Sequence, residues 1–219
     1  PLPLEVVIAV NSPGGSVATY GLAAAQLQRL SNSNITTTVC VDSVAASGGY
    51  MIASQADRLI AAPFATVGSV GVIIEGLNFY ELAKNHGVNP LVLKAGNSKN
   101  PLTSFGPVSR RDLDLQQKQL DRVHRAFREM VRNNRPFLDD DVTDGSVYFG
   151  QEAKARGLID AVKTMDEYIL ERIEAGDRVL KLHRSQQGRN KRRLTMLDLY
   201  PHLKTWATNA LAKRDVMAI

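Results

Sequence analysis

Two clusters of small residues, each placed directly after an apolar segment, are the first candidates for chemistry in this chain. One reads Ala-Ala-Ser-Gly-Gly over residues 45–49. Small neighbours would leave the Ser47 hydroxyl exposed at a sharp turn, with the Gly48 amide pointing where an oxyanion could form. Ser47 could equally be a plain N-cap residue of the following helix. The other cluster, residues 12–16, reads Ser-Pro-Gly-Gly-Ser and would bring backbone amides and a helix N-terminus close to an anionic group.

A nucleophilic serine needs a base, and the histidines of this chain are poor candidates. None follows a strand in the first half of the chain, and His124 is expected on the charged face of a long helix. They are His86, His124, His183 and His202. A lysine can act as the base if burial lowers its pKa by about three units. Lys94 and Lys99 share one short segment, and the residues alone do not choose between them.

Short apolar runs alternate with segments of helical periodicity, which predicts an α/β fold built from right-handed βαβ crossovers. The expected strands are 5–10, 36–41, 58–62, 67–74, 90–94 and 158–162. The expected helices are 16–30, 45–54, 78–85, a long helix from 109, 151–156 and 166–175.

Local signals predict where two of these helices begin or end, and the single cysteine limits the chemistry of one strand. Ser109 followed by Asp112 is typical of a capping box at the start of the long helix, whose apolar stripe should pack on the core. Gly157 stands where a helix ending at 156 needs its C′ glycine. Cys40 is the single cysteine, so the chain forms no internal disulfide and no cysteine-based zinc site, and we expect the thiol to be buried.

The charge of the 219-residue chain is divided unevenly along its length. Residues 1–177 hold 17 Lys/Arg and 20 Asp/Glu, whereas residues 178–219 hold 10 and 2. The positive charge therefore belongs to a tail rather than to the folded body, which argues against a nucleic-acid-binding domain. The tail contains a basic linker and an amphipathic segment around 199–211, which would pack on the protein or dock on an anionic membrane surface.

Five motifs in order resemble the signal-peptide-peptidase family of Ser-Lys peptidases (SppA/SohB), nearest to its SohB-like branch. They are Asn-Ser-Pro-Gly-Gly-Ser, Ala-Ala-Ser-Gly-Gly-Tyr, Val-Gly-Ser-Val-Gly-Val, Ala-Gly-Asn-Ser-Lys and Gly-Ser-Val-Tyr-Phe-Gly-Gln-Glu-Ala-Lys-Ala-Arg-Gly-Leu-Ile-Asp. The resemblance extends from about residue 6 to 174. It implies a Clp/crotonase-like superhelix of βαβ units over residues 1–177, truncated at its N-terminal side, with a C-terminal helical extension in 178–219.

The resemblance also assigns roles to residues that their types alone leave open. It makes Ser47 the nucleophile and Lys99 the base, with Ser69 orienting the lysine amine. The amides of Gly15 and Gly48 would stabilise the oxyanion. Gly14 and Ser16 would lie beside the bound peptide.

The family implies an acyl-enzyme peptidase that cleaves signal-peptide-like or membrane-derived peptides and uses no metal or organic cofactor. It implies a membrane-associated homo-oligomer in which Ser47 and Lys99 come from adjacent subunits, so that one chain alone would hold them too far apart to hydrogen-bond. Two alternatives remain at this stage. One is an inactive oligomeric scaffold of the same fold, and the other is a crotonase-type acyl-CoA enzyme with Glu75 as its carboxylate.

Overall fold

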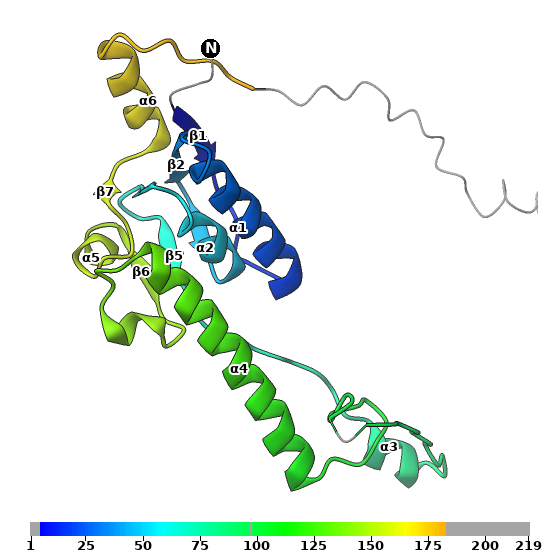
Figure 1. The fold of residues 1–219 in the computed structure, drawn as a ribbon. Helices are drawn as coiled ribbons and strands as arrows, with labels where there is room; N and C mark the ends of the chain where they lie inside the picture. Colours follow the sequence, from blue (N-terminus) through cyan, green and yellow to red (C-terminus); the bar gives the residue numbers. More distant parts are fainter. Residues whose placement is uncertain (1–4, 97, 183–219) are drawn as a thin grey trace, which may run out of the picture. The chain divides into compact units, whose positions relative to one another are not determined.

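The computed structural model describes residues 5–96 and 98–182. The chain divides into two units, residues 1–178 and 179–219, and the helices and strands described below belong to the first (Figure 1). The basic linker and the amphipathic segment expected around 199–211 lie outside the described residues.

Short parallel strands form most of the two sheets. One sheet has the order β1-β2-β4-β7, with every neighbouring pair parallel, and the other has the order β3-β5-β6, in which only β5 and β6 are antiparallel. The strands are β1 (Glu5–Ala9), β2 (Thr36–Val41), β3 (Val44–Ala46), β4 (Arg58–Ala61), β5 (Thr66–Gly68), β6 (Val147–Phe149) and β7 (Ala161–Val162). Parallel neighbours joined through helices confirm the predicted α/β class.

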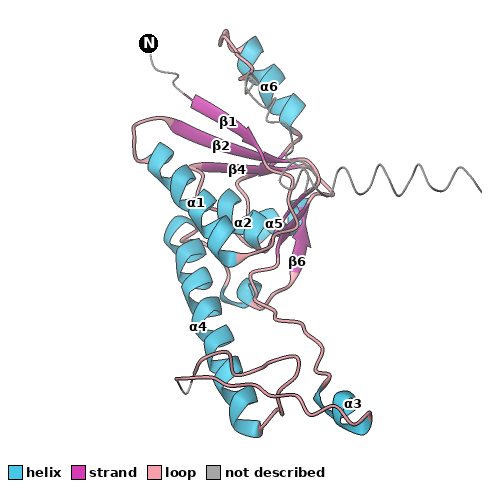
Figure 2. Cartoon of the chain, turned by 90° about the vertical axis from the view of Figure 1, so that its right-hand side faces the viewer, coloured by secondary structure: helices cyan, strands magenta, loops and turns pink. Residues whose placement is uncertain are grey.

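Helices connect these strands, and α1 packs on α2 (Figure 2). The helices are α1 (Val17–Ser31), α2 (Gly48–Ala53), α3 (Tyr80–Asn85), α4 (Arg110–Asn134), α5 (Gly150–Ala155) and α6 (Met165–Glu174), with a 3₁₀ turn, η1, at Asp140–Thr143. None of the described helices is long and apolar enough to span a bilayer.

The core is formed by the central strands and the helices packed against them. Val39, Val41 and Leu59 are fully buried, as parallel strands covered on both faces require. Inside the core, the Tyr50 hydroxyl donates a 2.7 Å hydrogen bond to the carbonyl oxygen of Leu158. This bond ties α2 to the segment that leads into β7.

The structure confirms three predictions that rest on residues close together in the sequence. The capping box of α4 is present, because the Ser109 side chain accepts from the Asp112 amide and the Asp112 carboxylate accepts from the Ser109 amide. Gly157 follows α5 with a φ of 78°, a left-handed conformation that suits glycine. Cys40 is buried, as predicted.

Four of the expected elements were wrong or too long. Residues 90–94 form no strand, because their backbone pairs with none of the strands of the two sheets. The strand expected over 67–74 ends at Gly68, where positive φ values at Gly68 and Ser69 turn the chain away. The helix expected over 45–54 is divided into β3 and α2 by the Ser47 turn, and the strand expected over 158–162 shrinks to β7. β6 was not expected at all.

Candidate functional site

Ser47 occupies a strained turn between β3 and α2. Its φ of 51° and ψ of −119° are sparsely populated for any residue with a side chain, and such conformations persist only where the surrounding structure imposes them. Ser47 stands at the N-cap position, yet its side chain makes no capping hydrogen bond. The plain N-cap interpretation of Ser47 is therefore wrong, and its half-buried hydroxyl remains available for other chemistry.

The glycine cluster at 14–15 lies directly against this turn. The amide of Ser12 donates to the Val44 carbonyl at 2.8 Å, and the Ala46 amide donates to the Ser12 carbonyl at 3.1 Å. Gly14 then approaches so closely that a Cβ at this position would lie 2.8 Å from both the Ser47 Cβ and the Gly48 nitrogen. The two clusters, separated by more than thirty residues in sequence, form one site.

The Tyr20 ring packs against Gly15 and Gly48, a contact that the sequence did not reveal. A Cβ on Gly15 would lie 2.9 Å from the Tyr20 ring, and one on Gly48 would lie 2.5 Å from it. Only residues without a Cβ fit between the ring and the Ser47 turn. In the sequence, Tyr20 is one apolar position within the expected helix 16–30, and no residue near it in the chain indicates a contact with Gly48.

Ser69 is brought to the same place by the pairing of β3 with β5. The Ser47 amide donates a 2.9 Å hydrogen bond to the carbonyl of Gly68, so the Ser69 backbone follows directly beside the Ser47 turn. Ser69 is half-buried and has a φ of 53°. Its own amide donates to the Ser146 carbonyl at 2.7 Å, which anchors the turn to the residue before β6.

His124 is a second residue whose role the sequence did not reveal. It was expected on the charged face of α4, but its Nε2 lies 2.9 Å from the Val70 carbonyl and 2.8 Å from the Thr143 carbonyl. Both partners are acceptors, so Nε2 carries the proton and donates. The expected exposed position was wrong because α4 turns this side of the helix toward the chain that follows Ser69. His124 thereby fastens α4 beside the candidate site.

Lys99 lies in the exposed loop between α3 and α4. Its amide donates to the Gly96 carbonyl at 3.0 Å, and the preceding carbonyl of Ser98 accepts from Gln119 Nε2 of α4 at 3.4 Å. No hydrogen bond joins Ser47 to Lys99 within the described part of the chain. The other sequence candidate, Lys94, lies 3.7 Å from the Asp112 carboxylate.

The positive charge of Lys94 is therefore balanced by the Asp112 carboxylate. Hydrogen bonds from Ser109, together with the nearby Lys94, hold the pKa of Asp112 below its usual value, so this carboxylate stays ionised beside the Lys94 ammonium. The Lys94 amine is thus engaged by Asp112 and by the carbonyl of Pro101, 3.5 Å away. Of the two lysines, Lys94 is the less suited to act as a base.

Two further site possibilities receive no support from the geometry. Glu75, the carboxylate that a crotonase-type enzyme would need, is exposed in the segment after β5. Among the described residues, no three His, Cys, Asp or Glu side chains come together in a way that could hold a metal ion.

A parallel α/β sheet that delivers a serine to a strained strand-to-helix turn is an arrangement found in enzymes with a serine nucleophile. Residues 29–178 match the model of Peptidase family S49, and the chain belongs to this family. It is 43% identical over 171 residues to a probable protease SohB of Haemophilus influenzae, covering 78% of this chain and 48% of the relative. It is 41% identical over 169 residues to a probable protease SohB of Buchnera aphidicola, covering 77% and 55%.

A third relative carries a different name. The chain is 38% identical over 195 residues to a Na⁺/H⁺ antiporter NhaA of Brucella abortus, and the match covers 86% of this chain but 26% of that protein. The antiporter name belongs to the whole of that protein, and the match covers only about a quarter of it. The chain spans about half the length of the SohB relatives that it matches.

Proposed function

We propose that this chain is the catalytic part of a Ser-Lys peptidase with a Clp/crotonase-like superhelix, in which Ser47 is the nucleophile. The observation that carries the proposal is the strained Ser47 turn, packed against Gly14 and followed by the Gly48 amide. As the first residue of α2, Gly48 has no partner for its amide within the helix. A serine hydroxyl and a helix-N-terminal amide are thus adjacent in the chain, which is what the proposed oxyanion chemistry requires.

The reaction proceeds through an acyl-enzyme. Neutral Lys99 accepts the proton of the Ser47 hydroxyl while Oγ forms a bond to the carbonyl carbon of the peptide. The Gly15 and Gly48 amides stabilise the negative charge on the carbonyl oxygen. Lys99 then protonates the leaving amine and afterwards activates water, which hydrolyses the ester. Ser69 holds the lysine amine in position.

The substrate is an extended peptide of the signal-peptide or membrane-derived class. It lies along the segment that contains Gly14 and Ser16, where it adds as a strand and pairs through its backbone. Ser16 is exposed at the N-terminus of α1 and its side chain makes no capping bond, so it is accessible to a bound chain. The proposal requires no metal or organic cofactor.

Homo-oligomerisation completes the site, with Lys99 reaching Ser47 of an adjacent subunit. The segment 71–108, which carries Lys99, exposes many large apolar side chains, more than isolated surface positions account for. They include Ile73, Ile74, Leu77, Leu82, Leu91, Leu93 and Phe105, each more than half exposed. Contact with another subunit would cover them.

We assign residues 1–177 to the peptidase and residues 178–219 to a basic extension that contacts an anionic membrane surface. This gives the membrane association that the family resemblance implies. The charge of the extension supports it, because clustered Lys and Arg attract anionic lipid.

Mixing two inactive variants tests the shared site. Ser47→Ala and Lys99→Ala should each abolish cleavage of a short apolar peptide. If the two residues act across a subunit boundary, equimolar mixed oligomers should recover about a quarter of the wild-type activity, because that share of boundaries pairs an intact serine with an intact lysine. No recovery after verified subunit exchange would place both residues in one chain. Failure of a serine-reactive probe to label Ser47 in the wild type would favour the scaffold.

A further inference from the structure

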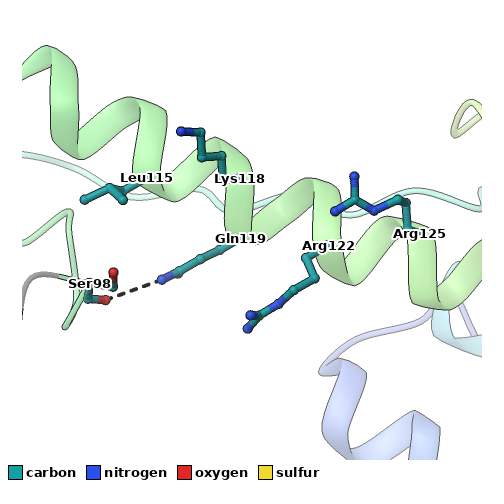
Figure 3. Close-up of a pocket in the computed structure, with 6 residues that line it drawn as sticks. All are labelled: Ser98, Leu115, Lys118, Gln119, Arg122 and Arg125. Atoms are coloured by element: carbon teal, nitrogen blue, oxygen red, sulfur yellow. Dashed lines mark hydrogen bonds between the residues drawn. The ribbon is translucent and has the colours of Figure 1, made fainter.

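A cationic pocket lies between α4 and the loop that carries Lys99. It has a volume of about 330 Å³, and Figure 3 shows its lining side chains. They are Ser98, Leu115, Lys118, Gln119, Arg122 and Arg125. Ser98 immediately precedes Lys99, and the hydrogen bond from Gln119 to its carbonyl holds the loop against the helix. The pocket therefore adjoins the residue that we propose as the base.

The positive charge of this pocket has no counter-ion in the described part of the chain. Lys118, Arg122 and Arg125 follow one side of α4 at helical spacing, and none of them forms an ion pair with a described residue. The nearest carboxylates of α4 are Asp114, Asp121 and Glu129; none of them belongs to the lining, and Asp121 accepts a hydrogen bond from Gln117. Three cations beside an open pocket are complementary in charge to an anionic group.

We propose that this pocket binds the C-terminal carboxylate of the peptide substrate. The inference rests on the proposed peptidase function and adds the substrate class, namely peptides with a free carboxyl end. A guanidinium presents two parallel donors that match the two oxygens of a carboxylate, so Arg122 and Arg125 suit this group in geometry as well as in charge. Leu115 provides an apolar wall for the last side chain of the peptide.

A carboxylate bound in this pocket places the C-terminal end of the peptide next to the loop that carries Lys99. Segments inside an intact protein would lack the group that the pocket recognises.

Binding to the full chain carrying Ser47→Ala tests the pocket without depending on catalysis. Two peptides of the same apolar sequence are compared, one ending in a free carboxylate and the other in a carboxamide. We expect the carboxylate form to bind about tenfold more tightly, the size of one good charge-assisted contact. Adding Arg122→Gln should remove most of this ratio, whereas Arg111→Gln, an exposed cation of α4 outside the pocket, should leave it unchanged. Equal binding of the two peptides to the parent protein would overturn the inference.

A reversed charge separates specific recognition from general attraction. With Arg122→Glu, a peptide ending in an aminoethyl amide should bind better than the carboxylate form. If Arg122→Gln changes the oligomer size by light scattering and leaves the peptide ratio unaltered, the pocket binds a second copy and the inference is wrong. Cleavage by the wild type, measured by mass spectrometry, tests the proposed function separately. If the wild type cleaves no peptide but still prefers the carboxylate form in binding, the peptidase proposal is wrong and the pocket proposal stands.

Discussion

The hydroxyl oxygens of Tyr20 and Ser12 lie 2.7 Å apart, and the Ser12 hydroxyl also accepts a 3.2 Å hydrogen bond from the Gly14 amide. α1 is thereby linked to the glycine turn through a single side-chain pair. The ring of Tyr20 packs against Gly48, and its hydroxyl is hydrogen-bonded to Ser12, which in turn accepts from the Gly14 amide. Tyr20 is therefore a positioning residue for the Ser47 turn.

Tyr20→Phe keeps the ring and removes only this hydroxyl contact. A hydrogen bond of this kind contributes about 1 kcal/mol, so we expect kcat to fall about fivefold with little change in KM. The measurement is steady-state cleavage of a short apolar peptide. Tyr80→Phe, on α3, serves as the matched control and should retain full activity. Wild-type kinetics in Tyr20→Phe would show that the Ser12 contact does not position the turn.

Gly48→Ala should damage the site by steric conflict, because the new methyl group would lie 2.5 Å from the Tyr20 ring. The ring or the turn must move, and overpacking of this kind costs about 1–3 kcal/mol. We expect a lower thermal midpoint and loss of at least about 90% of activity. Gly76→Ala is the control, since nothing lies within 4 Å of a Cβ there. Equal behaviour of the two variants would mean that Gly48 is not packed as described.

His124→Leu removes the donor that α4 provides to the carbonyls of Val70 and Thr143. Two carbonyls lose their partner and the segment after Ser69 becomes less constrained, so we predict a drop in kcat of about tenfold. His86→Leu is the comparison, because His86 is exposed just after α3 and its ring bonds only to the carbonyl of Leu82. A larger loss in His86→Leu would contradict this assignment.

Alkaline conditions should destabilise the fold through Cys40. Burial, reinforced by Asp42 and Glu5, raises the pKa of the Cys40 thiol from its ordinary value of 9.0 to about 12. Below pH 9 the thiol is neutral in both states and its contribution is complete. Between pH 9 and 12 only the unfolded chain loses the proton, so the free energy of unfolding falls as pH rises, by up to about 1.4 kcal/mol for each pH unit in this window.

Cys40→Ala isolates that effect from the titration of lysines and tyrosines. Thermal midpoints of wild type and variant are measured at pH 7.5 and pH 10.5. The decrease between the two values should be smaller for the variant, although its absolute midpoint is lowered by the missing side chain. Parallel decreases would show that Cys40 does not titrate differently in the folded state.

Prediction from the sequence succeeded where few residues interact over a short distance. β2 has the predicted bounds, and the capping box at Ser109 and the glycine after α5 were found because caps and turns depend on local backbone geometry. Residues 90–94 show the limit of this reasoning. An apolar run becomes a strand only if another strand lies alongside it, and a single segment carries no information about its neighbour.

The candidate site shows the same division. The small residues around Ser47 and the Gly-Gly pair after Pro13 are local requirements of tight turns, so the chain reveals them directly. The contact of Gly14 with Ser47, the support from Tyr20, the approach of Ser69 and the anchoring by His124 all join segments distant along the chain. These relationships depend on how parallel strands are ordered and on which face of each helix is buried, and only the packed tertiary structure decides both.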